Sequence, residues 1–182
     1  MESKFKKAIT LVYSNEPIIV PTDTVYGLVC RYDSKDAVEK IYKLKKRTRK
    51  KPLILLGCNW QALKPFVRII NKKELSKLIK KWPGAMTLIL PASKYVPRYL
   101  NKGYKTIGIR VPNNKFLLKL LKQCPEQVLA STSANISGEN DKAPQKELQK
   151  KVRLFIKAKK HEMSFKVSRI IELNKNGTMI IR

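Results

Sequence analysis

The chain has 182 residues, 43% of them apolar and 29% charged, which favours a globular protein with a sizeable core and argues against a disordered one. Forty basic residues against thirteen acidic ones leave a formal charge of +27, so polyanions such as RNA, nucleotides or phosphates are the expected partners. Lys far outnumbers Arg, and Asn and Ile are frequent, as an AT-rich genome would produce. Any binding site must therefore be argued from particular cations and not from their sum.

Cysteine and histidine usage excludes several kinds of site. Cys30, Cys58 and Cys124 are widely spaced and His161 is the only histidine, so we expect neither a structural zinc site nor a His-dependent catalytic triad. An odd number of scattered thiols favours a reducing compartment. Residues 1–17 contain no long apolar run, so we expect no signal peptide or membrane span and a cytoplasmic location.

Apolar periodicity predicts helices that alternate irregularly with strands. Helices are expected over residues 2–14, from Asp33 or Ser34 to Leu44, and over 60–66, 73–80, 115–122 and 146–155. Strands are expected over residues 18–20, 53–56, 86–90, 106–111, 128–130, 167–172 and 179–182, the last two joined through Asn176–Gly177. No internal repeat or low-complexity linker is present. The pattern predicts one domain over residues 1–182, with an α/β fold and a mixed sheet.

The sequence PTDTVYGL, residues 21–28, follows the expected strand 18–20 and is the first candidate site. Pro21 removes a backbone donor, and Thr22, Asp23 and Thr24 crowd side-chain oxygens at the end of the strand. Open α/β sheets bind ligands at such strand ends. An ordinary turn that caps a helix with Thr22 or Asp23 is the alternative interpretation.

The sequence STSANISG, residues 131–138, is the second candidate site. Ser131, Ser133 and Asn135 directly follow an apolar strand, and Gly138 closes the turn. Serine oxygens and backbone amides in such a turn can hold phosphate or carboxylate oxygens. A serine-rich loop with ordinary Asx and Ser turns is the alternative.

Several cations are candidates for binding an anion. Lys45 and Arg47 lie two residues apart, so in an extended segment both side chains project to one face and suit a polyphosphate. Lys51 lies further along the same basic stretch, for which a solvated Lys/Arg run is the alternative. Arg110 interrupts an apolar strand and is a candidate for the floor of a cleft. Arg182 is a similar cation, although fraying at the terminus is the simpler interpretation.

No nucleotide-binding motif of the Walker A or GxGxxG type occurs, so an ATP site would have to be built from separated strand ends and cations. In this light, six segments in order resemble the YrdC/TsaC family, the threonylcarbamoyl-AMP synthases. They are PTDTVYGL at 21–28, KxR at Lys45 and Arg47, KPLILL at 51–56, WPGAMTLIL at 82–90, IGIRVP at 107–112 and STSANISG at 131–138. The resemblance covers nearly the whole chain.

The resemblance implies a twisted open mixed β-sheet flanked by helices, with a concave basic cavity. It implies that L-threonine, bicarbonate and ATP, the last with Mg²⁺, give L-threonylcarbamoyl-adenylate and pyrophosphate. It further implies partner transferase proteins that move the threonylcarbamoyl group to the adenosine next to the anticodon of tRNAs reading ANN codons. Direct binding of tRNA to this chain is left open.

The resemblance also assigns roles to single residues. Lys45 and Arg47 become the catalytic cations. The expected ATP contacts are Arg47, Lys51, Thr106, Ser133, Asn135 and Arg182. The expected threonine contacts are Thr24, Arg110, Ser131 and Ser168. No protein side chain is an evident metal ligand or general base.

The chain departs from the family at a few positions. Leu56 stands where many members have His, and Thr48 stands where a Pro is usual. The chain ends at Arg182, so we expect the short, single-domain type. A non-catalytic module that binds double-stranded RNA or tRNA is the alternative function, which the charge favours. Carbamoyl transfer as in hydrogenase maturation proteins is disfavoured, because those proteins carry further domains.

Overall fold

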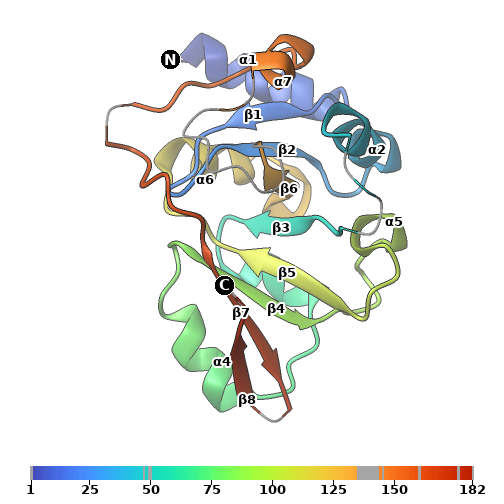
Figure 1. Ribbon diagram of the computed structural model, residues 1–182, viewed down its shortest axis with the longest axis vertical. Coiled ribbons are helices and arrows are strands. Elements are labelled where there is room, and N and C mark those ends of the chain that lie inside the picture. The colour runs from blue at the N-terminus through green and yellow to red at the C-terminus, as the bar shows by residue number, and fades with distance from the viewer. Residues whose placement is uncertain are drawn as a thin grey trace.

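The computed structural model describes residues 2–46, 48, 51–134, 144, 146–159, 161–175 and 177–181 (Figure 1). Its centre is a sheet of strands β1 (Ile18–Val20), β2 (Gly27–Arg31), β3 (Ile54–Gly57), β4 (Met86–Pro91), β5 (Thr106–Arg110), β6 (Val128–Ser133), β7 (Arg169–Asn174) and β8 (Gly177–Ile180). The eight strands are ordered β1-β2-β6-β3-β5-β4-β7-β8. Pairs β3–β5 and β4–β7 are parallel and the others antiparallel, which confirms the predicted open mixed sheet.

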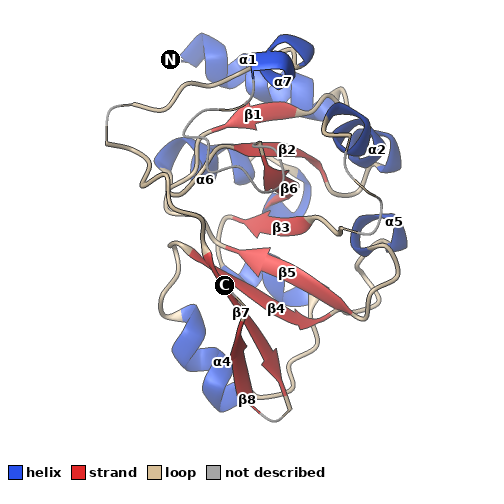
Figure 2. Cartoon of the chain, viewed as in Figure 1, coloured by secondary structure: helices blue, strands red, loops and turns tan. Residues whose placement is uncertain are grey.

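Helices flank this sheet (Figure 2). They are α1 (Glu2–Tyr13), α2 (Lys35–Leu44), α3 (Trp60–Leu63), α4 (Lys72–Ile79), α5 (Arg98–Asn101), α6 (Lys115–Leu121) and α7 (Lys146–Lys151), with 3₁₀ turns at Lys64–Phe66 and Pro125–Gln127. Polar side chains fix several helix starts, since Ser34, Asn71 and Asn114 each accept a hydrogen bond from a backbone N–H in the first turn. Ser34, and not Asp33, therefore caps α2.

Some of the expected boundaries were wrong. The expected helix 146–155 ends at Lys151, because Leu154 and Ile156 instead form backbone hydrogen bonds with Ile19 of β1. Strand β7 begins two residues later than expected, since its pairing with β4 starts at Arg169. Strand β8 covers 177–180 and not 179–182, because the hairpin register begins directly after the turn, at Gly177.

Two elements were missed by the sequence interpretation. After the turn at 21–26 the chain enters β2, so Thr22 and Asp23 cap no helix and that alternative is wrong. Helix α5 has only four residues, too few to give a periodic pattern. Strand β2 depends on tertiary contacts, since it pairs with β1 and β6 on either side of it.

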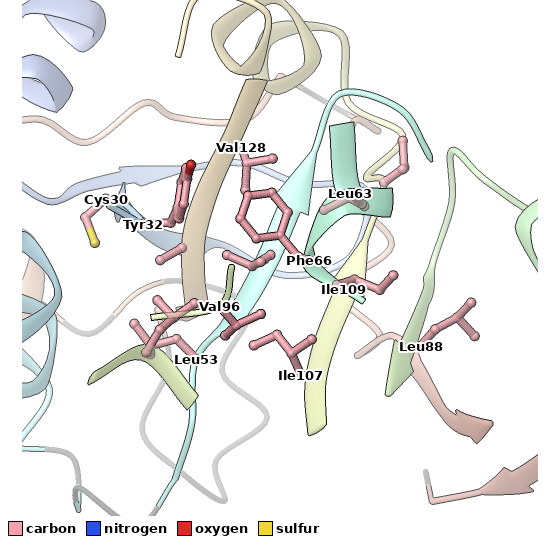
Figure 3. Packing of buried hydrophobic residues seen from close by; sticks show 14 of the residues in the cluster. Cys30, Tyr32, Leu53, Leu63, Phe66, Leu88, Val96, Ile107, Ile109 and Val128 are labelled. Atoms are coloured by element: carbon pink, nitrogen blue, oxygen red, sulfur yellow. The ribbon is translucent and has the colours of Figure 1, made fainter. Parts of the chain in front are cut away.

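One side of the sheet, here called the core side, is covered by helices. Residues that pair across neighbouring strands point to the same side of a sheet. The register places six such residues in one row, namely Cys30, Ala130, Leu55, Ile109, Leu88 and Ile171. All six are buried in a cluster with side chains from α2, α3, α4 and α5. Figure 3 shows part of this packing, with Phe66 and Leu63 over strand residues that include Ile109.

The opposite side, here called the open side, is covered only in part. A second row crosses the same strands one residue away and contains Val29, Ser131, Ile54, Gly108, Ile89 and Glu172. Helices α1 and α6 bury the end of this side nearest β1 and β2, where they pack on Val29, Leu56 and Leu129. Ile54, Gly108, Ile89 and Glu172 stay half-exposed. This uncovered part of the sheet positions the site described next.

Candidate active site

A strip of polar side chains lies on the open side, from three strands that are far apart in sequence. This polar strip consists of Ser131 and Ser133 of β6, Thr106 and Arg110 of β5, and Thr87 of β4. Alternation along each strand puts them on the same side as Gly108 and Ile89. Four of them were predicted site residues, and the sheet register brings all four onto one surface.

The hydroxyl-rich turn at 21–26 lies beside the end of β6. Gly27 pairs with Ser133, and the Ala134 N–H donates to the carbonyl of Tyr26 at 2.7 Å. Within the turn, the Thr22 hydroxyl donates to the Val25 carbonyl at 2.7 Å and accepts from the Thr24 N–H at 3.0 Å. The two candidate segments of the sequence analysis, 21–28 and the start of 131–138, are therefore neighbours.

Arg110 ties this turn to the polar strip. Its Nη1 donates to Thr24 Oγ1 at 2.8 Å, and its Nη2 donates to Asp23 Oδ1 at 2.7 Å. Its Nε donates to the Gly84 carbonyl at 3.0 Å. Arg110 is 5% exposed and Thr24 is 1% exposed. Burial lowers the pKa of Arg110, and the charge of Asp23 opposes that effect.

Ser168 reaches the strip through a second contact between distant segments. Its hydroxyl lies 3.0 Å from the hydroxyl of Thr87, and both side chains are buried. The segment just before it is fixed to the turn, because the Ser164 N–H donates to the Asp23 carbonyl at 3.1 Å and the Phe165 N–H donates to the Thr24 carbonyl at 2.9 Å. Thr24, Arg110 and Ser168 thus come from three separate parts of the chain.

The sequence interpretation missed Asp23 and Thr87 as site residues. Asp23 was recognised only as part of an oxygen-rich turn, and Thr87 only as part of a strand. A buried arginine needs an anionic partner, so the expectation of Arg110 in an apolar strand could have led to a search for an acid near it. No local signal pointed to Thr87, whose partner lies 81 residues away.

Lys45 lies at the other end of the strip. Its Nζ donates to the Ser133 carbonyl at 2.5 Å. The residue caps α2 in a helical conformation, with φ −88° and ψ −3°, so the extended geometry assumed for this position is wrong. The helix end itself, and not an extended segment, directs the ammonium group toward β6.

The remaining predicted ATP contacts are Arg47, Lys51, Asn135 and Arg182. The side chain of Lys51 is exposed, and its carbonyl accepts a hydrogen bond from the Tyr42 hydroxyl at 2.8 Å. Arg47, Asn135 and Arg182 lie outside the described residues. The assignments of these three residues, and of Lys51, to ATP stay predictions.

A pocket of about 300 Å³ lies between the segment before β1, helix α2 and the end of α7. Its lining is Glu16, Pro17, Lys40, Lys43, Leu44, Lys151 and Val152. None of the predicted site residues is among them, so this pocket is not the expected substrate site. Among the residues that the structure describes, no three His, Cys, Asp or Glu side chains gather in a way that could hold a metal ion. In the same part of the chain, no helix is both long enough and apolar enough to span a membrane.

Comparison with known proteins identifies the family. The family described as "Sua5_yciO_yrdC: Telomere recombination" matches residues 10–182. This chain belongs to that family. The sequence resemblance to the YrdC/TsaC synthases is thereby confirmed.

Family members with known names are similar over most of the chain. A threonylcarbamoyl-AMP synthase of Pseudoalteromonas translucida (strain TAC 125) is 37% identical over 141 residues, which are 76% of this chain and 75% of that protein. A threonylcarbamoyl-AMP synthase of Escherichia coli O6:H1 (strain CFT073) is 33% identical over 133 residues, which are 72% of this chain and 70% of that protein.

Solved structures of family members have the same fold. The crystal structure of P. abyssi Sua5 complexed with L-threonine superposes with a TM-score of 0.88 at 30% identity. The match covers 100% of this chain and 54% of that one, so this chain spans about half the length of Sua5. E. coli YciO superposes with a TM-score of 0.83 at 25% identity, covering 100% of this chain and 89% of that one. The expected YrdC-like architecture is confirmed.

Proposed function

We propose that this chain is a threonylcarbamoyl-AMP synthase, a nucleotidyltransferase that forms L-threonylcarbamoyl-adenylate and pyrophosphate from L-threonine, bicarbonate and ATP. The observation that carries the proposal is the convergence of Thr24, Arg110, Ser131 and Ser133 on the open side of the sheet. The relatives that share this fold and a third or more of the aligned residues are synthases of this kind.

The buried end of the polar strip is the proposed threonine subsite. Arg110 supplies the positive charge for the carboxylate, because its guanidinium is fixed by three hydrogen bonds and each terminal nitrogen keeps one N–H for a ligand. Thr24, Ser131 and Ser168 supply hydroxyls for the remaining polar groups. The complex of P. abyssi Sua5 with L-threonine supports an amino-acid site in a protein of this fold.

The end of the strip nearest Lys45 is the proposed ATP subsite. Lys45 reaches the last residue of β6, and Thr106 begins β5 on the same side of the sheet. Arg47, Lys51, Ser133, Asn135 and Arg182 complete the proposed contacts. ATP enters as its Mg²⁺ complex, with the ion held by the phosphate oxygens, which are the oxygen ligands that Mg²⁺ prefers.

The reaction follows from these two subsites in two steps. The amine of threonine attacks carbon dioxide with release of a proton to solvent, or bicarbonate with loss of water, and gives a carbamate. A carbamate oxygen then attacks the α-phosphorus of ATP, the bond to the β-phosphate oxygen breaks, and pyrophosphate leaves. Lys45 and Arg47 neutralise the triphosphate, so positioning and charge stabilisation supply most of the catalysis.

The proposal extends to the setting of the enzyme. The chain acts in the cytoplasm as a single domain over residues 1–182. Its product passes to partner transferase proteins, which modify the adenosine next to the anticodon of tRNAs reading ANN codons. The +27 charge also suits direct contact with tRNA.

A non-catalytic RNA-binding module is the second candidate, favoured by the same charge. Such a module needs exposed cations and aromatic platforms. It has no use for a buried arginine held against Thr24 and Asp23 on the open side of the sheet. That contact therefore favours the enzyme.

Mass spectrometry of the product formed from ATP, bicarbonate and labelled threonine tests the function. Wild-type protein is expected to give threonylcarbamoyl-adenylate, and Lys45→Ala is expected to lower pyrophosphate release at least about 100-fold. Lys43→Ala is the matched control, since Lys43 is an exposed lysine of the last turn of α2. Undiminished release by Lys45→Ala, or RNA binding without product from wild type, would refute the synthase.

A further inference from the structure

Asp23 and Arg110 form an ion pair that is almost removed from solvent. The Nη2–Oδ1 distance is 2.7 Å, and the two side chains are 6% and 14% exposed for Arg110 and Asp23 respectively. Oδ1 also accepts the backbone N–H of Asn113 at 3.1 Å. Oδ2 has no hydrogen-bond partner among the described residues and is not fully buried, so it can accept a hydrogen bond from a ligand.

The guanidinium of Arg110 also has N–H donors that make no hydrogen bond within the described part of the chain. An arginine carries five N–H donors, and three of those of Arg110 serve Gly84, Thr24 and Asp23. One donor on each terminal nitrogen therefore remains without a partner in the described part of the chain. The pair thus presents a positive donor and a negative acceptor next to each other, on the side of the sheet where the polar strip lies.

Charge balance limits what can bind there. The pair is neutral as it stands, so a simple carboxylate would bring one uncompensated negative charge into a poorly solvated place. An α-amino acid carries a carboxylate and an ammonium group on the same carbon. Its two charges can pair with Arg110 and Asp23 at once and leave the site neutral.

We propose that Asp23 binds the α-amino group of the amino-acid substrate through Oδ2 while Arg110 binds its carboxylate, so that this pair selects α-amino acids over carboxylic acids without the amine. The inference rests on the proposed function, since it specifies how the threonine subsite recognises its ligand. The same contact positions the nitrogen, which becomes the nucleophile of the first step after the ammonium group has given one proton to bicarbonate.

The surroundings of Asp23 suit this role because they fix it before any ligand arrives. Its backbone carbonyl accepts from the Ser164 N–H, and the neighbouring Thr24 carbonyl accepts from the Phe165 N–H. The Thr24 hydroxyl accepts from Arg110, so the turn and the arginine are held together at two adjacent residues. A preorganised pair of charges loses little entropy on binding.

Calorimetric titration with two ligands of the same carbon skeleton tests the inference. L-Threonine carries the amine, whereas 3-hydroxybutanoate lacks it. Wild-type protein is expected to bind threonine at least about 10-fold more tightly. In Asp23→Asn we expect the affinity for threonine to fall about 10-fold, and that for 3-hydroxybutanoate to stay or rise because Arg110 keeps its charge. The preference should therefore nearly vanish.

Asp33→Asn is the matched control. It makes the same change of charge and also breaks an Asp–Arg ion pair, with an Arg31 Nη2–Asp33 Oδ2 distance of 2.7 Å, but strands β6 and β3 separate Arg31 from Arg110. Its ligand preference should equal that of wild type. Circular dichroism confirms that each variant is folded before titration.

Two results would overturn the inference. Equal affinity of wild type for both ligands would do so without any variant, even if Asp23→Asn failed to fold. An unchanged preference in folded Asp23→Asn would do so as well. Failure of the proposed function is seen separately, as absence of threonylcarbamoyl-adenylate in the product assay, whereas the ligand preference is measured by binding alone.

Discussion

The two sides of the sheet are built from the same strands but differ in the polarity and burial of their side chains. On the core side, the row through Leu55, Ile109 and Leu88 is apolar and fully buried. On the open side, the row one residue away places Ser131 and Gly108 among half-exposed neighbours. In β4 and β5 the fully buried apolar row therefore lies on one face and the proposed ligand site on the other, although their residues alternate along each strand.

This division depends on register. Because side chains alternate with a period of two, a slip of one residue would exchange the two faces of a strand. In β5, Thr106, Gly108 and Arg110 alternate with Ile107 and Ile109, and only the second set enters the core. Strand β5 thus contributes side chains both to the hydrophobic core and to the candidate site.

The largest effect is expected from the core side. Leu88→Ala should lower the free energy of unfolding by about 2–5 kcal/mol, because it leaves a cavity in a fully buried row. Ile89→Ala is the control in the same strand, and it should cost clearly less since Ile89 is half-exposed on the open side. Urea denaturation measures both. If both variants lost the same free energy of unfolding, the two sides would not differ in their contribution to stability.

The sequence alone predicted the helices, strands and site candidates that a short stretch of residues indicates by itself. Apolar periodicity indicated most strands and helices, and the hydroxyl-rich turn and Arg110 were recognised as site candidates. The rest depends on contacts between distant residues. Strand β2 is defined by its two neighbours, and Thr87 gains its role only from Ser168, which no spacing in the sequence indicates.

A smaller effect on substrate binding is expected from the open side. Thr87→Val keeps the shape of the side chain but removes the hydroxyl that lies 3.0 Å from that of Ser168. Loss of this hydrogen bond leaves Ser168 less well oriented, so the KM for threonine should rise about 3–10-fold at saturating ATP.

The control for this variant sharpens the comparison. Thr132→Val makes the same substitution at a buried residue that pairs with Leu28, on the core side of β6. It should leave the KM for threonine unchanged, whatever it does to stability. A similar rise of KM in both variants would mean that the two sides do not differ in their contact with substrate.

The smallest effect is expected from an ion pair at the rim of the open side. Arg31 and Arg110 lie in one row across the sheet, since Arg31 pairs with Leu129, Leu129 with Leu56 and Leu56 with Arg110. The side chains of the Arg31–Asp33 pair are 25% and 31% exposed, far more than those of the Arg110–Asp23 pair. Asp33→Asn should therefore lower the free energy of unfolding by less than about 1 kcal/mol at pH 7.

The pH dependence of this small loss in free energy of unfolding tests whether the charge of Asp33 causes it. Hydrogen bonds from Arg31 lower the pKa of Asp33 below 3.8, the usual value for the carboxyl group. A carboxylate with a lowered pKa adds stability above its unfolded pKa and loses it as the pH falls through the folded value. The difference between wild type and Asp33→Asn should thus be full at pH 7 and shrink below about pH 4. If the difference in free energy of unfolding between wild type and Asp33→Asn stayed constant down to pH 2, the loss would come from packing and not from charge. The more exposed Arg31 and the buried Arg110 could then not be contrasted as ion pairs on the same face.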